Sequence, residues 1–137
     1  MTRYTKGANA ERELIKLLFS KGFAVARVAG SGVASLPCPD IVALKQGRQL
    51  AIECKAWKQR YLSIAVGQMD ELANWSKTAG GEMYIAWKLP YKGWFFLQPR
   101  HFNKSRKFYV VSQKKAQKHG LSLEIVTGEQ ATIPAKK

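Results

Sequence analysis

The sequence predicts an α/β domain in which a mixed sheet is flanked by helices. Two observations support this prediction. A helical pattern near the N-terminus is followed by three strand-like segments, a second helical pattern and further strands. A length of 137 residues is also the size of one ordinary domain. Repeats and linkers are absent from the sequence, so we expect one domain over residues 1–137, with a flexible tail from about residue 133.

The first helix is expected over residues 6–21. Its apolar side chains fall on one helical face, and Gly22 is placed to end it. Residues 23–28 are β-branched and aromatic, which favours a strand. Residues 29–39 are rich in Gly, Ser and Pro, and are therefore expected to form a loop.

Residues 40–44 and 49–57 are predicted to form two strands of a hairpin. The four residues between them include Gly47, which supplies the turn. A second helix is expected to begin at Ser63 as its N-cap and to end at Gly80. Further strands are expected over residues 82–87, 94–97, 108–111 and 121–126.

The charge of the chain indicates a nucleic-acid partner. The 23 Lys and Arg residues outnumber the 9 Asp and Glu residues, and the net charge is +14. Between Glu82 and Glu124 the sequence contains no acid but many lysines and arginines. Such an imbalance attracts polyanions. The alternative is a solvated face that serves solubility alone, although soluble surfaces normally mix both signs.

The two cysteines, Cys38 and Cys54, lack the spacing of a zinc site or a disulfide framework. We expect both to be reduced thiols in a cytoplasmic protein. Residues 1–13 contain no apolar core of a signal peptide, and no stretch approaches the roughly 18 apolar residues that a membrane span requires. No membrane association is expected.

The hairpin brings two acids together. If its turn is centred between Gln46 and Gly47, paired residues sum to 93, and Asp40 lies opposite Glu53. Directly opposed side chains have Cβ atoms about 5 Å apart, where like charges are destabilising. A divalent cation between the two carboxylates is the simplest reason for such a pair.

The alternation of the second strand places Glu53 and Lys55 on one face, together with Ala51. Ile52 and Cys54 point to the other face. The alternative interpretation is a solvated face with an ordinary surface ion pair, because half-exposed antiparallel strands alternate in the same way.

A third acid favours the metal site. Glu11 precedes Leu14, Ile15 and Leu18 by three, four and seven positions, at or beside the buried face of the first helix. The alternative is an acid in the first turn that interacts with the helix dipole. Glu13, by contrast, neighbours Lys16 and is expected to be exposed.

Three carboxylates form a set of hard oxygen ligands suited to Mg²⁺, or to Mn²⁺ in its place. In such a site Lys55 would orient the attacking water or stabilise the charge that develops on a scissile phosphate.

Several stretches resemble known nucleases. Pro39-Asp40, twelve residues and then Glu53-Cys54-Lys55 match the PD-(D/E)XK nuclease pattern. The wider sequence resembles the archaeal Holliday-junction resolvases, and the stretches that carry this likeness are residues 6–18, 22–27, 29–31, 67–70, 93–96 and 121–124.

The resemblance implies a restriction-endonuclease-like fold and a homodimer that makes paired symmetric nicks in four-way DNA junctions by Mg²⁺-dependent hydrolysis. It implies metal binding by Glu11, Asp40, Glu53 and the Cys54 backbone carbonyl, catalysis by these acids with Lys55 and Ser31, and phosphate binding by Arg12 and Arg27. Ser31 can equally be an ordinary loop serine.

The resemblance also places the second helix at the dimer interface, through Met69, Leu72 and Trp75. Periodicity alone is equally consistent with core packing of this stripe. The junction-contacting surface is expected to include Lys6, Lys58, Arg60 and the basic C-terminal half. Two other functions stay open, namely a PD-(D/E)XK nuclease that cuts linear duplex, and a non-catalytic basic DNA-binding module.

Overall fold

The computed structural model describes residues 3–28 and 36–129, with side chains from residue 7 onward. The elements are α1 (Arg3–Ser20), β1 (Ala24–Arg27), β2 (Ile41–Lys45), β3 (Arg48–Lys55), β4 (Tyr61–Ala65), α2 (Val66–Ala79), β5 (Glu82–Leu89), β6 (Gly93–Leu97), the 3₁₀ turn η1 (Pro99–His101), β7 (Asn103–Lys104), β8 (Phe108–Ser112), α3 (Gln113–His119) and α4 (Leu123–Val126).

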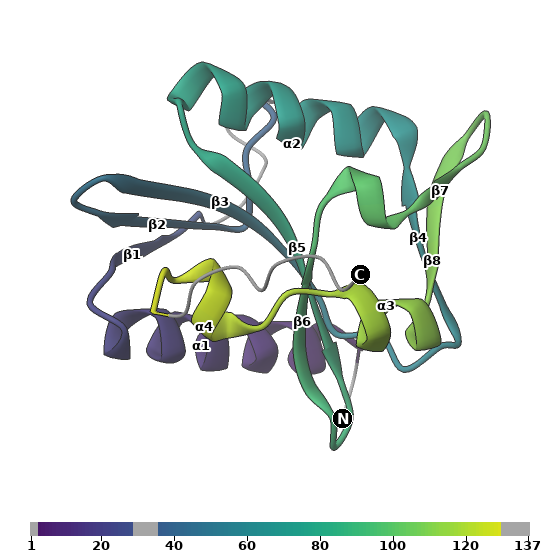
Figure 1. The fold of residues 1–137 in the computed structure, drawn as a ribbon, viewed down its shortest axis with the longest axis horizontal. Coiled ribbons are helices and arrows are strands. Elements are labelled where there is room, and N and C mark those ends of the chain that lie inside the picture. The colour runs from purple at the N-terminus through teal and green to yellow at the C-terminus, as the bar shows by residue number, and fades with distance from the viewer. Residues whose placement is uncertain (1–2, 29–35, 130–137) are drawn as a thin grey trace, which may run out of the picture.

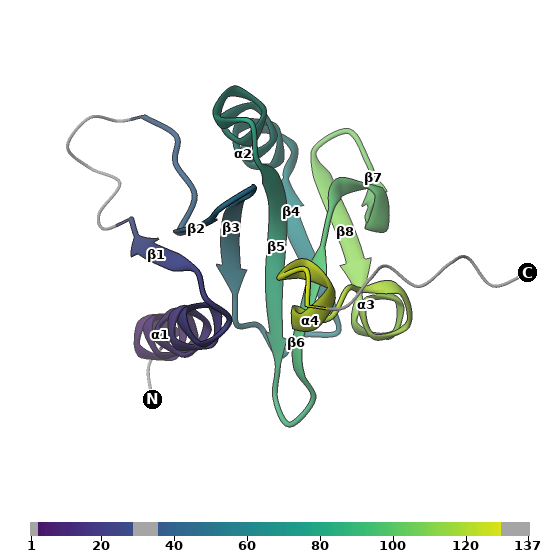
Figure 2. The same ribbon diagram turned by 60° about the vertical axis from the view of Figure 1, so that its left-hand side comes forward.

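The main sheet has five strands in the order β1-β2-β3-β5-β6. It is mixed, because β3 and β5 are parallel whereas the other neighbours are antiparallel. A smaller sheet, β4-β8-β7, lies beside α2 on the side away from β1 (Figure 2). The predicted fold class, a mixed sheet flanked by helices, is confirmed.

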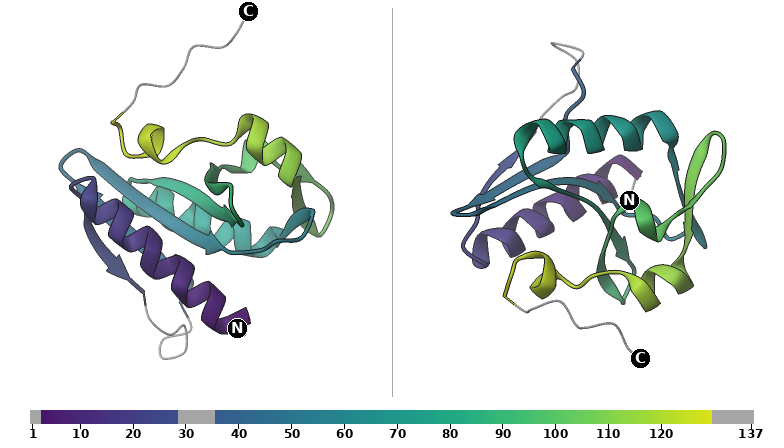
Figure 3. Two further views of the ribbon diagram at one scale, coloured as in Figure 1. Left: turned by 90° about the horizontal axis from the view of Figure 1, so that it is seen from below. Right: turned by 45° about the horizontal axis from the view of Figure 1, so that its top comes forward.

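The two long helices cover opposite faces of the main sheet (Figure 1). Met69 and Leu72 of α2 join one core cluster with Ala51 of β3. Leu14 of α1 joins a second cluster with Ile52 of the same strand. Seen from below, α1 crosses the sheet next to β1 and β2 (Figure 3, left). Because both faces of β3 are covered, polar side chains on this central strand are desolvated.

The hairpin register follows the prediction. Lys45 pairs with Arg48 and Ile41 with Ile52, so the paired positions sum to 93 as expected. Gly47 adopts the positive φ of 81° that the turn requires and that glycine adopts without strain. Asp40 lies immediately before β2, at the end of β3 that carries Glu53 and Lys55.

The predicted start of the second helix is wrong. Ser63 does not cap a helix but lies within β4, where it pairs with Val110 of β8. Leu62 and Ile64 are buried by this pairing, so strand formation is favoured over a local cap. The helix begins after Ala65, and its predicted end at Gly80 is confirmed by a left-handed φ of 77°.

The C-terminal region also differs from the prediction. Leu121 forms only an isolated bridge with Phe96, and residues 123–126 form α4 rather than a strand. The proposed tail at 133–137 lies outside the described residues. Within the described ranges, no helix is long and apolar enough to cross a membrane.

Candidate active site

Asp40 is fixed by backbone groups from the strands on either side of it. Its carbonyl oxygen accepts a hydrogen bond from the Val28 amide at 2.9 Å. Its carboxyl Oδ2 accepts one from the Cys54 amide, also at 2.9 Å. The side chain therefore points across the hairpin toward β3, as the predicted register requires.

Glu53 and Lys55 project from the face of β3 that α2 covers. Their side chains are only 15% and 17% exposed, and Lys55 Nζ lies 3.8 Å from Glu53 Oε2. Lys55 also lies over the ring of Trp57, with Nζ 5.8 Å from its centroid. The alternative of a solvated face is therefore wrong, because helix packing removes most of the water from both groups.

Glu11 lies well inside α1, which begins at Arg3. A helix-dipole effect falls off within the first turn, so that alternative does not explain this acid. The Glu11 side chain is 20% exposed, and its Oε1 accepts a hydrogen bond from Arg27 Nε at 2.8 Å. The charge of Glu11 acts on both Asp40 and Glu53 and raises their pKa values.

Burial, with repulsion from neighbouring carboxylates, raises the pKa values of Glu53 and Asp40. Burial raises the pKa of Glu53 to about 7, and repulsion from Asp40 and Glu11 adds to this effect against the opposing attraction of Lys55. Burial likewise raises the pKa of Asp40, opposed by the hydrogen bond from Cys54. The site therefore carries more negative charge than its own cations compensate, which is the situation that a bound cation would relieve.

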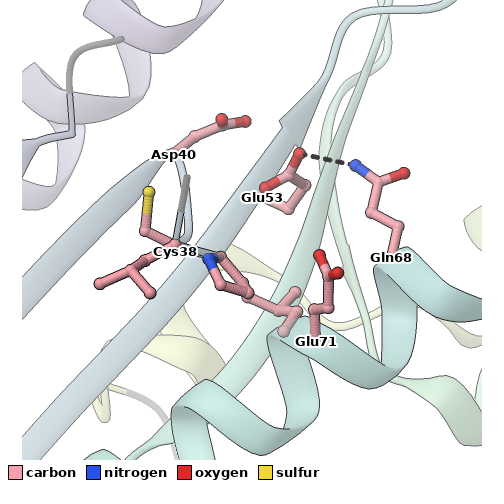
Figure 4. A pocket seen from close by; sticks show the side chains of 8 residues that line it. Cys38, Asp40, Glu53, Gln68 and Glu71 are labelled. Carbon is pink, nitrogen blue, oxygen red and sulfur yellow. Dashed lines mark hydrogen bonds between the residues drawn. The ribbon is translucent and has the colours of Figure 1, made fainter. Parts of the chain in front are cut away.

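A cavity of about 600 Å³ opens beside Asp40 and Glu53, and α2 forms its opposite wall. Gln68 Nε2 donates a hydrogen bond to Glu53 Oε2 at 3.1 Å. Figure 4 shows Asp40 and Glu53 at one side of the cavity, with Gln68 and Glu71 facing them from the helix. Cys38, an exposed thiol, lies at the rim.

The acidic side chains of the described residues do not form a complete set of metal ligands. Among the described residues, no group of three or more His, Cys, Asp or Glu side chains is arranged to hold an ion. Asp40 and Glu53 nevertheless offer hard oxygen donors that suit Mg²⁺, and the Cys54 carbonyl is an additional oxygen nearby in sequence. Glu11 Oε1 accepts the hydrogen bond from Arg27, so a cation that used this oxygen would compete with Arg27.

A model of the archaeal Holliday junction resolvase family matches residues 2–133 of the chain. The chain belongs to this family.

Individual resolvases are similar over most of their length. A crossover junction endodeoxyribonuclease from Archaeoglobus fulgidus is 38% identical over 121 residues, which cover 88% of this chain and 87% of the relative. One from Methanocaldococcus jannaschii is 34% identical over 113 residues, covering 82% and 80%. The solved Archaeoglobus fulgidus resolvase superposes with a TM-score of 0.81 at 34% identity, over 90% of this chain and 96% of that one. The expected family and its fold are confirmed.

The basic residues expected to bind phosphate differ from one another in their surroundings in this chain. Arg27 is paired with Glu11, whereas Arg12 is exposed and donates to Asn9 Oδ1 at 3.2 Å. Lys58 and Arg60 are exposed beside α3, in a second hollow. The side chain of Lys6 and the whole of Ser31 lie outside the described residues, so the roles expected for them stay predictions.

The apolar stripe of α2 divides into two parts. Met69 and Leu72 are buried in the core of the monomer, which favours core packing as the reason for their spacing. Trp75 is only half-buried. It lines an apolar hollow beside Leu44, whose side chain is exposed. Trp75 is thus the member of the stripe that could still contact a partner subunit.

The contacts of two residues, Gln68 and Glu13, were not identified from the sequence. Gln68 lies in a stretch that carried the family resemblance, but nothing local indicated that it would reach Glu53. Glu13 was expected to be exposed near Lys16, and this was wrong in part. Its carboxylate is 43% exposed, yet it accepts hydrogen bonds from Lys88 Nζ at 2.6 and 2.5 Å and from Trp94 Nε1 at 2.6 Å.

Proposed function

We propose that this chain is a structure-selective DNA endonuclease that resolves four-way junctions by paired, symmetric nicks through metal-assisted hydrolysis. The observation that carries the proposal is the half-buried pair Asp40 and Glu53, with Lys55 beside them, in a protein of net charge +14. Curated relatives named crossover junction endodeoxyribonucleases support the choice of substrate.

In this proposal Asp40, Glu53 and the Cys54 carbonyl hold Mg²⁺, or Mn²⁺ in its place. Bound there, the cation would offset the repulsion between the carboxylates and DNA, polarise the scissile phosphate and lower the pKa of the attacking water. Lys55, held over Trp57, orients that water or stabilises the charge that develops on the phosphate.

The ion pair between Glu11 and Arg27 fits the same scheme. If Glu11 turns to the cation, its ion pair with Arg27 is broken at the edge of the site. A guanidinium there can bind a phosphate oxygen in a two-pronged geometry, and Arg12 on the same helix as Glu11 supplies a further positive charge. The approach of a cation and the binding of the DNA backbone would then reinforce one another.

Two symmetric nicks require two active sites, and we propose that a homodimer provides them, with Trp75 at the interface. A four-way junction has approximate two-fold symmetry, which a two-fold dimer matches. Light scattering at micromolar protein tests this part. A stable species of 15.4 kDa would contradict it, since that is the mass of the monomer.

The central experiment compares a synthetic four-way junction with a duplex that contains the same strand sequences, at equal protein and Mg²⁺ concentrations. We expect cleavage of the junction at paired positions and little cleavage of the duplex. Equal cleavage of both substrates would favour the restriction-type nuclease. Binding without cleavage of either substrate, in Mg²⁺ and in Mn²⁺, would favour the non-catalytic basic module.

A further inference from the structure

A second hollow lies beside α3, and its lining residues are separate from those of the cavity at Asp40 and Glu53. We call it the α3 groove. Its volume is about 910 Å³, and its walls are formed by Lys58, Arg60, Tyr61, Ser112, Gln113, Lys114, Gln117 and Lys118. These residues come from the β3–β4 connection, the start of β4, the end of β8 and the first two turns of α3.

The groove is positively charged and contains an exposed aromatic ring. Four of its lining residues are cationic and none is acidic. Tyr61, next to Arg60 along the chain, is 53% exposed, although tyrosine rings are normally better covered. A cationic groove with an exposed ring is the arrangement that binds single-stranded nucleic acid, since cations contact phosphates and the ring stacks on a base.

Hydrogen bonds connect the two walls of the groove. Gln113 Nε2 donates hydrogen bonds to the carbonyl oxygens of Lys58 and Gln59, at 3.1 and 2.8 Å. The Gln113 amide donates to the Arg60 carbonyl at 2.9 Å. The β3–β4 connection, which carries Lys58 and Arg60, is therefore held against α3 by Gln113. The shape of the groove is present before any ligand binds.

The groove begins close to the proposed active site. Lys58 follows Lys55 by three residues, a span of about 10 Å at most. The intervening Trp57 contacts Lys55 through its ring, and its carbonyl accepts a hydrogen bond from Trp87 Nε1 at 2.8 Å. A DNA strand that lies at Lys55 therefore needs to extend by only a few nucleotides to reach the groove.

We propose that the α3 groove binds an unpaired stretch of the cleaved DNA strand next to the branch point, with Tyr61 stacked on an exposed base. This inference rests on the proposed function. Bases within a continuous duplex are stacked on both sides and cannot reach the ring, whereas bases at an open crossover can. The groove would therefore contribute to the preference for junctions over duplex.

Tyr61→Ala tests the stacking, with Tyr61→Phe as the matched control that keeps a ring. Binding is measured by fluorescence anisotropy with the full chain in EDTA, on a labelled four-way junction, an oligothymidine strand and a matched duplex. For Tyr61→Ala we expect roughly five- to hundredfold weaker binding to the junction and the single strand, and unchanged binding to duplex. Tyr61→Phe should bind like the parent. An equal loss on all three ligands, or no loss on any, would overturn the proposal.

Lys114→Gln and Lys118→Gln test the phosphate contacts. The control is Lys45→Gln, which removes the same charge at the β2–β3 turn, far from α3 (Figure 1). In each groove variant we expect the slope of log affinity against log salt to become shallower by about 0.7 to 0.9 for each phosphate that is no longer neutralised. The control should keep the parent slope. Equal slopes in all three variants would show only a general charge effect and would overturn the proposal.

The outcomes separate this inference from the proposed function. A protein that cuts junctions selectively, but whose binding and cutting are unaffected by Tyr61→Ala, would refute the groove alone. A protein that cuts no junction, but whose single-strand and junction binding fall in Tyr61→Ala, would refute the nuclease and support the groove.

Discussion

Two clusters of acidic and basic side chains in this molecule differ in the direction in which the pKa values of their carboxyl groups are shifted. Glu13 of α1 is bound by Lys88 and Trp94, and its hydrogen bond with Lys88 holds its pKa below the ordinary value. Asp40 and Glu53 have partners too, yet both pKa values are raised, because burial and repulsion from neighbouring carboxylates outweigh those partners.

This difference separates a structural ion pair from a candidate active site. At Glu13 the charged form of the carboxyl group is stabilised by Lys88 and Trp94. The cluster therefore links α1 to β5 and β6, and its negative charge is satisfied without a bound cation. At Asp40 and Glu53 the charged form is disfavoured until a cation arrives. Perturbed pKa values of the second kind mark functional sites, since folding alone does not favour such an arrangement.

Asp40→Asn and its control Glu13→Gln are expected to differ most from each other, both in junction cleavage and in stability. Asparagine keeps an oxygen for the Cys54 amide but removes one metal-binding charge. We expect junction cleavage to fall by more than roughly 100-fold, as loss of outer partners of a metal already costs 10- to 100-fold. The melting temperature should stay the same or rise, because a buried charge is removed.

Glu13→Gln should behave in the opposite way. It should retain cleavage and lose about 1 kcal/mol of stability, a modest value because the carboxylate is 43% exposed and screened by water. Single-turnover cleavage and urea unfolding measure both effects. If Asp40→Asn cut junctions at the parent rate, the acidic site would have no role in catalysis.

The pH dependence of stability should also have opposite signs at the two clusters. The Glu53 pKa is raised to about 7, so the stability that Glu53 contributes is full below its ordinary value near 4.5 and is lost as the pH rises through 7. The effect is on the order of 3 kcal/mol in metal-free protein. The lowered pKa of Glu13 means that its contribution is present above the ordinary value and is lost in acid.

Urea unfolding in EDTA at pH 5 and pH 8 tests this, with Glu53→Gln as the reference. The difference between parent and variant should change across that range and should shrink when Mg²⁺ or Mn²⁺ is added at pH 8. An unchanged difference would show that Glu53 is not held near neutrality by its surroundings.

A smaller effect is expected from Gln68→Ala. The amide of Gln68 holds one oxygen of Glu53, and its loss would leave the carboxylate less well oriented. We expect Mn²⁺ binding, measured by calorimetry, to weaken by roughly tenfold, with little change in stability. Asn74→Ala, at an exposed position of the same helix, is the control. Equal effects of both substitutions would indicate a general perturbation of α2.

The smallest effect is expected from Trp94→Phe. Phenylalanine keeps the stacking on Phe96 but cannot donate to Glu13. We expect a loss of roughly 1 kcal/mol or less, and no change in cleavage, because Lys88 still holds the carboxylate. Thermal unfolding measures the first effect. A loss of cleavage would mean that the Glu13 cluster also positions α1 for catalysis.

The part of the site that could be predicted from the sequence depends on local geometry. Asp40 and Glu53 lie on one hairpin, so the turn at Gly47 sets their register without help from the rest of the fold. The position of Glu11 followed from helical spacing, which is also local. The hairpin pair Asp40 and Glu53 could therefore be assembled from the sequence, whereas helical spacing placed Glu11 only on a face of α1.

The features that sequence reasoning missed depend on contacts between distant segments. Ser63 resembled a helix cap, but its strand is stabilised by pairing with β8, more than forty residues away. Glu13 bonds to Lys88, 75 positions along the chain. Gln68 reaches Glu53 only because α2 packs across β3. No local pattern encodes such partners, since each depends on how helices and sheets dock.

The hydrogen bond from the Cys54 amide to Asp40 has a practical consequence. The nitrogen of this one backbone group lies 2.9 Å from the carboxylate on which the proposed chemistry depends. The NMR frequencies of the nitrogen and its proton will follow the protonation of Asp40 and the arrival of a cation, without any introduced probe. A single resonance in an ¹⁵N spectrum would thus report the state of the centre throughout a titration with metal or DNA.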